Sequence, residues 1–153
     1  MAITKGKNIN KYLSYRMAHS RIKRSIQNHY YLEAITLQES ILSDRIISIA
    51  LENQLFTIKE TEVHKNLTLG CLINRLSQSN FEYDQIITQL NEFNKKRNTC
   101  IHAMVKSFPG KAPLNMVDFR ILSQETCNLG NKVIASIKSL QSKLRASKKK
   151  IVK

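Results

Sequence analysis

One short stretch of the chain combines a permanent cation with a side chain that can transfer protons near neutral pH. It covers residues 96–102 (KRNTCIH), so an arginine and a histidine stand five residues apart. Arginine binds phosphate oxygens through two parallel N–H donors, and histidine can act as a general acid or base. Arg97 and His102 are therefore candidate catalytic residues for a reaction at a phosphate group.

The helix expected around this stretch gives Arg97 an unusual position. Apolar residues recur every three or four positions and form one stripe, made of Ile86, Leu90, Phe93, Cys100, Ile101 and Met104. At about 100° per residue, Arg97 falls in the middle of that stripe. A cation that faces a core is costly unless an opposite charge pairs with it. We therefore expect either a functional arginine or a structural ion pair with Glu52 or Asp44.

Asn98 is the third candidate catalytic residue. It stands four residues before His102, so the two side chains share one face of a helix. The amide of Asn98 could hold one ring nitrogen of His102 and select its tautomer. Arg97 and His102, in contrast, point about 140° apart around the helix. We expect one of the two to face the bundle and the other to face a cleft or a partner.

A polar row in the helix expected over residues 29–56 is the candidate supporting network. Its members stand seven residues apart, which is nearly two helical turns, and they interrupt an apolar face. They are Gln38, Arg45 and Glu52, with Asp44 and Glu39 near the edges of the same face. The row either forms a buried network that partners Arg97 or lies at the edge of the core in contact with water.

The positive charge of the chain lies at its two ends. The 153 residues carry a net charge of +14, yet residues 29–125 hold ten basic and eleven acidic residues. Residues 1–28 hold seven basic residues and residues 126–153 hold eight, with no acidic residue in either segment. Such ends favour binding to polyanions, nucleic acid before a membrane surface, or else only aid solubility. The residues expected to bind RNA are Lys95 and Lys96 beside the motif, and Arg21, Lys23, Arg24, Lys148, Lys149 and Lys150 at the ends.

The elements that must position these residues are helices. Apolar periodicity and cap residues predict helices over about 11–28, 29–56, 66–75, 81–106 and 115–146, with a loop at 57–65 and flexible ends. Asn66 and Asn115 are the candidate N-caps of the third and last helix. The sequence thus predicts an all-α antiparallel bundle of four or five helices. Its expected parts are a basic N-terminal arm or helix (1–28), the bundle (29–146) and a basic tail (147–153).

Composition argues against several classes of protein. No stretch approaches the ~20 apolar residues that span a membrane. The start has no apolar signal core, so we expect a cytoplasmic protein without a membrane partner. Cys71, Cys100 and Cys127 are far apart and form no CxxC pair, which favours reduced, mostly buried thiols. No convincing carboxylate–histidine cluster is present, and we expect neither a metal nor another cofactor.

The motif and the helical order resemble the HEPN domain, an α-helical ribonuclease fold of toxin–antitoxin, abortive-infection and type VI CRISPR systems. Arg97, Asn98 and His102 match the family pattern of an arginine, a polar residue that is often asparagine, three to five further residues and a histidine. The order of a long helix, a short one, the motif helix and a long closing helix also matches over residues 29–146. The resemblance therefore covers most of the chain in the order of its helices, but only three residues match the catalytic motif.

The resemblance implies a metal-independent endoribonuclease in a toxin or anti-phage defence role. His102 would act as the general base on the 2′-hydroxyl or as the general acid on the leaving 5′-oxygen, and Arg97 would stabilise the phosphorane. The products would end in a 2′,3′-cyclic phosphate. The resemblance also implies a homodimer with motif packed against motif, and an antitoxin or other neutralising partner. Met104 stands where members silenced by AMPylation carry tyrosine, so this silencing is not expected.

Two other functions are compatible with the sequence. One is a catalytically silent HEPN-like module that binds RNA or a nucleotide. The other is a basic helical protein that binds nucleic acid, which is disfavoured because no compact helix-turn-helix with a glycine turn is visible. Arg24 and His29 also stand five residues apart, but Arg24 lies in a basic run.

Overall fold

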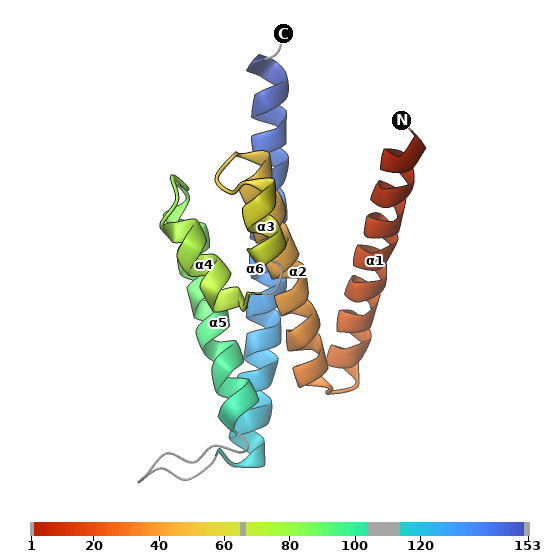
Figure 1. The fold of residues 1–153 in the computed structure, drawn as a ribbon. Helices are drawn as coiled ribbons and strands as arrows, with labels where there is room; N and C mark the ends of the chain where they lie inside the picture. The colour runs from red at the N-terminus through yellow and green to blue at the C-terminus, as the bar shows by residue number, and fades with distance from the viewer. Residues whose placement is uncertain (1, 65–66, 104–113, 152–153) are drawn as a thin grey trace.

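The computed structural model describes residues 2–64, 67–103 and 114–151 of the chain. These residues form six helices and no strand: α1 (Ala2–Gln27), α2 (Tyr31–Glu52), α3 (Ile58–His64), α4 (Leu69–Ser77), α5 (Asp84–Ala103) and α6 (Met116–Ile151). Helix α1 is antiparallel to α2, and α5 is antiparallel to α6, whereas α2 and α6 run in the same direction (Figure 1). The prediction of an all-α antiparallel bundle is confirmed, with six helices in the described ranges where four or five were expected.

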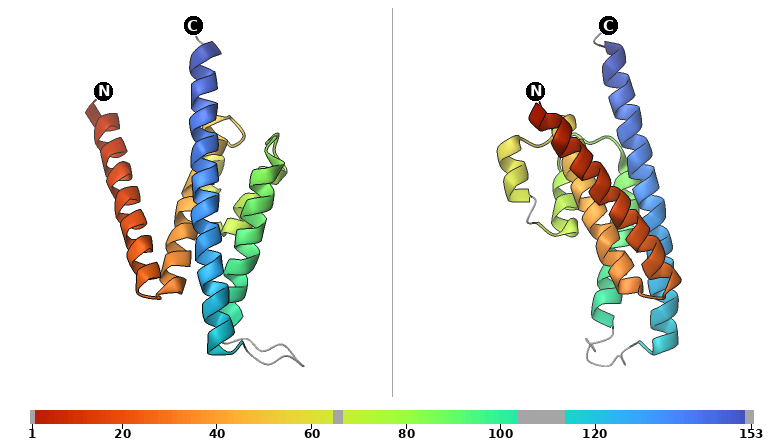
Figure 2. Two further views of the ribbon diagram at one scale, coloured as in Figure 1. Left: turned by 180° about the vertical axis from the view of Figure 1, so that it is seen from behind. Right: turned by 90° about the vertical axis from the view of Figure 1, so that its right-hand side faces the viewer.

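The core lies between α2, α5 and α6, and α4 closes one side of it. Fully buried side chains from these helices meet there, among them Ile35, Leu42, Ile46, Leu72, Leu90, Phe93 and Ile137. Their spacing of three, four or seven residues along each helix is the apolar periodicity that the sequence shows. The short helix α3 lies on the outside of the bundle, against α2 (Figure 2).

Helix α1 packs against α2 on the side away from α5 (Figures 1 and 2). Of its described side chains, only Ile22 and Ser25 are buried. Several of its contacts with α2 are polar, and they include Ser25 Oγ donating to Glu33 Oε2 at 2.6 Å. The turn between the helices contains His29, whose φ of 62° lies in the left-handed region. Helix α1 is thus attached to the bundle mainly through the side that faces α2 and through the turn at His29.

The basic ends differ from the sequence-based expectation, because both are helical. Helix α1 begins at Ala2, not near residue 11, and α6 continues past residue 146 to Ile151. Lysine and alanine are good helix formers, so a concentration of positive charge does not by itself end a helix. Of the helices in the described ranges, none has both the length and the hydropathy needed to cross a membrane.

Helix α3 occupies most of the segment expected to be a loop, so that expectation was wrong. The segment begins with a capping box: Glu60 N donates to Thr57 Oγ1 at 3.2 Å, and Thr57 N donates to Glu60 Oε2 at 2.7 Å. Two backbone N–H groups are satisfied reciprocally in this way, which favours a helical turn even in a polar sequence. The Thr-x-x-Glu pattern is visible in the sequence and was the available signal.

Two other helix starts are set by different residues from those expected. The N-cap of α4 is Thr68, whose Oγ1 accepts from Cys71 N at 3.4 Å, and the expected cap Asn66 lies outside the described residues. Helix α5 begins at Asp84, not at residue 81, and its expected end at 104–106 is also outside the described residues. The expected cap at Asn115 is confirmed, because its Oδ1 accepts from Asp118 N at 2.9 Å.

The three thiols should differ sharply in reactivity. Cys100 and Cys127 are fully buried, and burial raises the pKa of Cys127 to about 12, whereas Cys71 is exposed. Because the thiolate is the reactive form, an aromatic disulfide reagent at pH 8 should label one thiol per native chain and three per unfolded chain. In the Cys71→Ser variant the native signal should disappear. Rapid labelling of more than one thiol in the native protein would contradict the buried positions.

Candidate functional site

Arg97 lies on the face of α5 that packs toward α2, where it forms an ion pair with Glu39. Its Nε donates to Glu39 Oε2 at 3.0 Å, and its Nη2 donates to the same oxygen at 2.5 Å. The two side chains are only 21% and 16% exposed. A shielded pair of this kind offsets the cost of placing a cation within an apolar stripe.

The carboxylate that pairs with Arg97 differs from the two expected structural partners. Glu52 and Asp44 were the expected ion-pair partners, and both are engaged elsewhere. The seven-residue row that ends at Glu52 points toward α6, and Glu39 stands one residue beyond the first member of that row. One residue turns the helix by about 100°, which is enough to direct Glu39 toward α5 instead.

Asn98 contacts Arg97 instead of His102. Its Oδ1 accepts from Arg97 Nη1 at 2.6 Å, so the amide orients the guanidinium. The expected role of Asn98 in fixing the tautomer of His102 is therefore corrected. Together, Glu39 and Asn98 take three of the five N–H groups of Arg97, and two N–H groups on Nη1 and Nη2 remain for an anion.

His102 stands near the end of α5 and is exposed. Cys100, two residues earlier, faces α6, where its Sγ lies 3.3 Å from Thr126 Oγ1. No hydrogen bond joins the His102 side chain to another residue of the described ranges. Arg97 thus faces the bundle while His102 faces outward, five residues apart and about 7.5 Å apart along the helix axis.

The four expected supporting residues do not gather around Arg97. Gln38 is fully buried, and its Nε2 donates to Cys127 O at 2.8 Å and to Asn131 Oδ1 at 2.9 Å in α6. Asp44 faces α1, where it accepts from the Tyr15 hydroxyl and forms an ion pair with Lys11 at 2.9 Å. These side chains support the contacts of α2 with α1 and α6, so the network expected around Arg97 is corrected.

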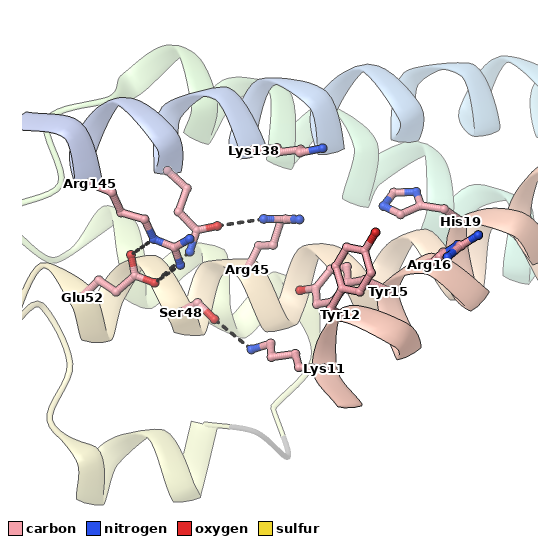
Figure 3. A pocket seen from close by; sticks show the side chains of 11 residues that line it. Lys11, Tyr12, Tyr15, Arg16, His19, Arg45, Ser48, Glu52, Lys138 and Arg145 are labelled. Carbon is pink, nitrogen blue, oxygen red and sulfur yellow. Dashed lines mark hydrogen bonds and ion pairs between the residues drawn. The ribbon is translucent and has the colours of Figure 1, made fainter. Parts of the chain in front are cut away.

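Arg45 and Glu52 belong to a chain of polar contacts between α2 and α6 (Figure 3). Arg45 Nη1 donates to Gln141 Oε1 at 2.8 Å, and Gln141 Nε2 donates to Glu52 Oε1 at 3.0 Å. Glu52 also accepts from Arg145 Nε at 2.9 Å. The hydrogen bonds from Arg145 are the main cause of the lowered pKa of Glu52. No pattern in the sequence indicates Gln141 or Arg145 as members of this chain.

The residues expected to bind RNA have varied surroundings. Lys95, Lys23 and Arg24 are exposed. Lys96 forms an ion pair with Glu125 at 3.3 Å, Arg21 pairs with Glu33 at 2.7 Å, and Lys148 Nζ donates to the backbone carbonyl of Glu52. The side chains of Lys149 and Lys150 lie outside the described residues. The exposed cations can meet a phosphate without breaking an ion pair, whereas the paired ones must first exchange a partner.

Two polar sites therefore lie along α2, one shared with α5 and one shared with α1 and α6, and the second of them is drawn in Figure 3. Within the described ranges, no group of three or more His, Cys, Asp and Glu side chains is placed to hold a metal ion. The first site contains Arg97 and His102, and the second contains Arg45 and Glu52. No protein-family model, no curated protein and no solved structure matches this chain.

Proposed function

We propose that the chain is a metal-independent endoribonuclease of HEPN type, in a toxin or anti-phage defence role, and that Arg97 and His102 carry its chemistry. The observation that supports this most is the state of Arg97. Its guanidinium is oriented by Glu39 and Asn98, yet two of its N–H groups take no part in those contacts. An oriented cation with donors to spare is suited to a developing phosphorane charge.

The proposed reaction needs only the RNA and the side chains of the protein. A general base removes the proton of a 2′-hydroxyl, and the oxygen attacks the adjacent phosphorus while the bond to the 5′-oxygen breaks. The leaving oxygen takes up a proton, and the products are a 2′,3′-cyclic phosphate and a free 5′-hydroxyl. His102 serves as one of the two proton-transfer groups, and Arg97 binds the non-bridging oxygens.

A direct test is to incubate the purified protein with a mixed RNA in EDTA. Cleavage products ending in a 2′,3′-cyclic phosphate, identified by mass spectrometry, support the proposal. Intact RNA across a range of sequences and concentrations favours the alternative, a silent module that binds RNA or a nucleotide. Cleavage that stops in EDTA but proceeds with magnesium contradicts the metal-independent chemistry.

We also propose that the site is completed by a second copy of the chain. Exposed apolar residues lie at the start of α6 and near the end of α5, and they are Met116, Val117, Ile121 and Ile101. The contact between Cys100 and Thr126 sets an antiparallel register that places residue 124 level with His102, so Ile121 lies within about one helical turn of that level. A symmetric interface there would bury the patch and bring two motif helices together.

This interface predicts that Ile121→Lys converts a dimer into a monomer. Ile121 is 53% exposed, so the substitution should leave the folded chain nearly unchanged while it places charges opposite each other at the two-fold axis. Light scattering at micromolar concentration measures the mass, and RNA cleavage should fall in parallel. Arg75→Glu, on an exposed position of α4, is the control and should remain dimeric. A wild-type protein that is active and monomeric contradicts the shared site.

A further inference from the structure

A cavity of about 630 Å³ opens between α1, α2 and α6 (Figure 3). This volume is typical of sites for small ligands. Five of its lining side chains are lysines or arginines and only one is a carboxylate. The charged residues are Lys11 and Arg16 from α1, Arg45 and Glu52 from α2, and Lys138 and Arg145 from α6.

The carboxylates near the cavity neutralise only part of this charge. Arg145 is paired with Glu52, and Lys11 is paired with Asp44 at its edge. Arg16 and Lys138 are exposed and form no ion pair with any described residue. Cationic side chains from three helices therefore line this cavity, and an anion bound there would be attracted by the charges of all three helices.

Arg45 is the lining residue whose hydrogen bonding points most specifically to a ligand. Its Nη1 donates to the neutral amide of Gln141, and its guanidinium carbon lies 4.8 Å from the centre of the Tyr15 ring. Its Nε is buried and has no hydrogen-bond partner among the described residues. A buried donor without an acceptor costs free energy, and a small shift of the guanidinium toward a ligand oxygen in the cavity would remove that cost.

The cavity also offers aromatic surface next to the cations. Tyr12 and Tyr15 line its α1 wall, and the ring of Tyr15 lies beside Arg45 and His19 (Figure 3). Tyr12 is 65% exposed, so one face of its ring can meet a planar group. Stacking on an exposed tyrosine is a common way to bind a nucleobase, as cationic side chains are for phosphate.

We propose that this cavity binds a nucleotide unit, with its phosphate on Arg45, Lys138 and Arg16 and its base on Tyr12. The shared chemistry is a phosphate attached to a nucleoside, which a free nucleotide or one unit of an RNA strand can supply. The proposal does not rest on RNA cleavage, because none of these residues belongs to the Arg97 site. The cavity is either a ligand site on the bundle or a second RNA contact away from the motif.

Calorimetric titration with three probes tests the proposal on the full chain. The probes are AMP, ATP and a ten-nucleotide 2′-O-methyl oligo(A), which lacks the 2′-hydroxyl needed for cleavage. The double variant Arg16→Gln/Lys138→Gln removes two charges from exposed positions and should weaken binding by about tenfold or more. Lys132→Gln/Lys143→Gln removes the same charge from exposed positions of α6 outside the cavity, and should weaken it less than about twofold.

The pattern of loss separates the two sources of the nucleotide unit. If ATP binds and loses affinity in the cavity variant, the ligand is a free nucleotide. If only the oligonucleotide binds and loses affinity, the cavity holds one unit of a strand. The proposal is wrong if none of the probes binds, or if the control variant loses as much affinity as the cavity variant, because that result reflects net charge alone.

His19 provides a second readout inside the cavity. Its pKa lies below the usual 6.5 because of partial burial first, and then because of the charges of Arg45 and Lys138. Tyr15, one turn earlier on α1, is its ring neighbour at 6.4 Å, and Lys11, Arg16, Glu52 and Arg145 also line the cavity. A bound phosphate adds negative charge, which favours the protonated imidazole and raises this pKa.

The titration of His19 can be followed by nuclear magnetic resonance, with the His19→Gln variant to assign its signal. Saturating ATP or oligonucleotide should move the midpoint to higher pH. Lys138→Gln should also raise the midpoint in the free protein, because it removes a like charge. If a saturating probe binds the protein but leaves the His19 midpoint unchanged, the placement of the ligand in this cavity is wrong.

Discussion

The His102→Ala variant should lose RNA cleavage by a factor of at least about 100, because a positioned proton-transfer group contributes about 10²–10⁴-fold. Its free energy of unfolding should change by less than about 0.5 kcal/mol, since His102 is exposed and contacts no described residue through a hydrogen bond. Single-turnover cleavage of a labelled RNA and urea unfolding measure the two quantities. Arg24→Ala is the matched control and should retain the cleavage rate.

Arg97 needs a different design, because Arg97→Ala removes a cation and also leaves Glu39 unpaired. That variant should lose both cleavage and stability. The double variant Arg97→Leu/Glu39→Leu replaces the shielded ion pair by apolar side chains, which often restores stability. If Arg97 binds the phosphorane, the double variant is folded and inactive. A folded double variant with full activity would show that the ion pair is only structural.

Gly130→Ala in α6 should destabilise the protein by about 1–2 kcal/mol, although alanine is the better helix former. A Cβ atom there would lie 2.3 Å from Gln38 Oε1 and 2.8 Å from Phe93 Cε2. Gln38 cannot move away easily, since it is fully buried and its Nε2 donates to two acceptors in α6. The ring of Phe93 is equally enclosed. Thermal unfolding followed by circular dichroism measures the loss.

A second substitution tests the reason for this loss. Gln38→Ala opens the space that the added methyl group needs, so the double variant Gln38→Ala/Gly130→Ala should be more stable than the sum of the two single losses indicates. The expected coupling is about 1 kcal/mol or more. Strict additivity would mean that the close approach of α2 and α6 at Gly130 does not limit the packing.

The helices could be predicted from sequence where periodicity is strong, and less well where it is weak. The apolar stripe of α2 predicts this helix, and the capping pair at Asn115 predicts the start of α6. Helix α3 has few apolar residues, so its only signal was the reciprocal cap at Thr57. The concentration of positive charge predicts flexible ends, but the residues there favour helix, and the ends of α1 and α6 are helical.

The candidate site shows what periodicity leaves undetermined. The position of Arg97 in an apolar stripe correctly indicated that it needs a partner. The choice of Glu39 depends on where α5 crosses α2, and a pattern along one helix does not contain the crossing point. The cavity was missed for the same reason, because Tyr15, Arg45 and Lys138 come from three helices and share no spacing.

The one-sided attachment of α1 makes the cavity wall a separable part of the molecule. Few described side chains of α1 are buried. Two of its contacts with α2 are surface ion pairs, Lys11 with Asp44 and Arg21 with Glu33, and dissolved salt weakens such pairs by screening. Segments of this kind open in local excursions while the rest of a domain stays folded. Helix α1 can therefore move away from α2 as a unit about the turn at His29. A ligand bound between Tyr12 and Lys138 would stabilise α1 in its packed position.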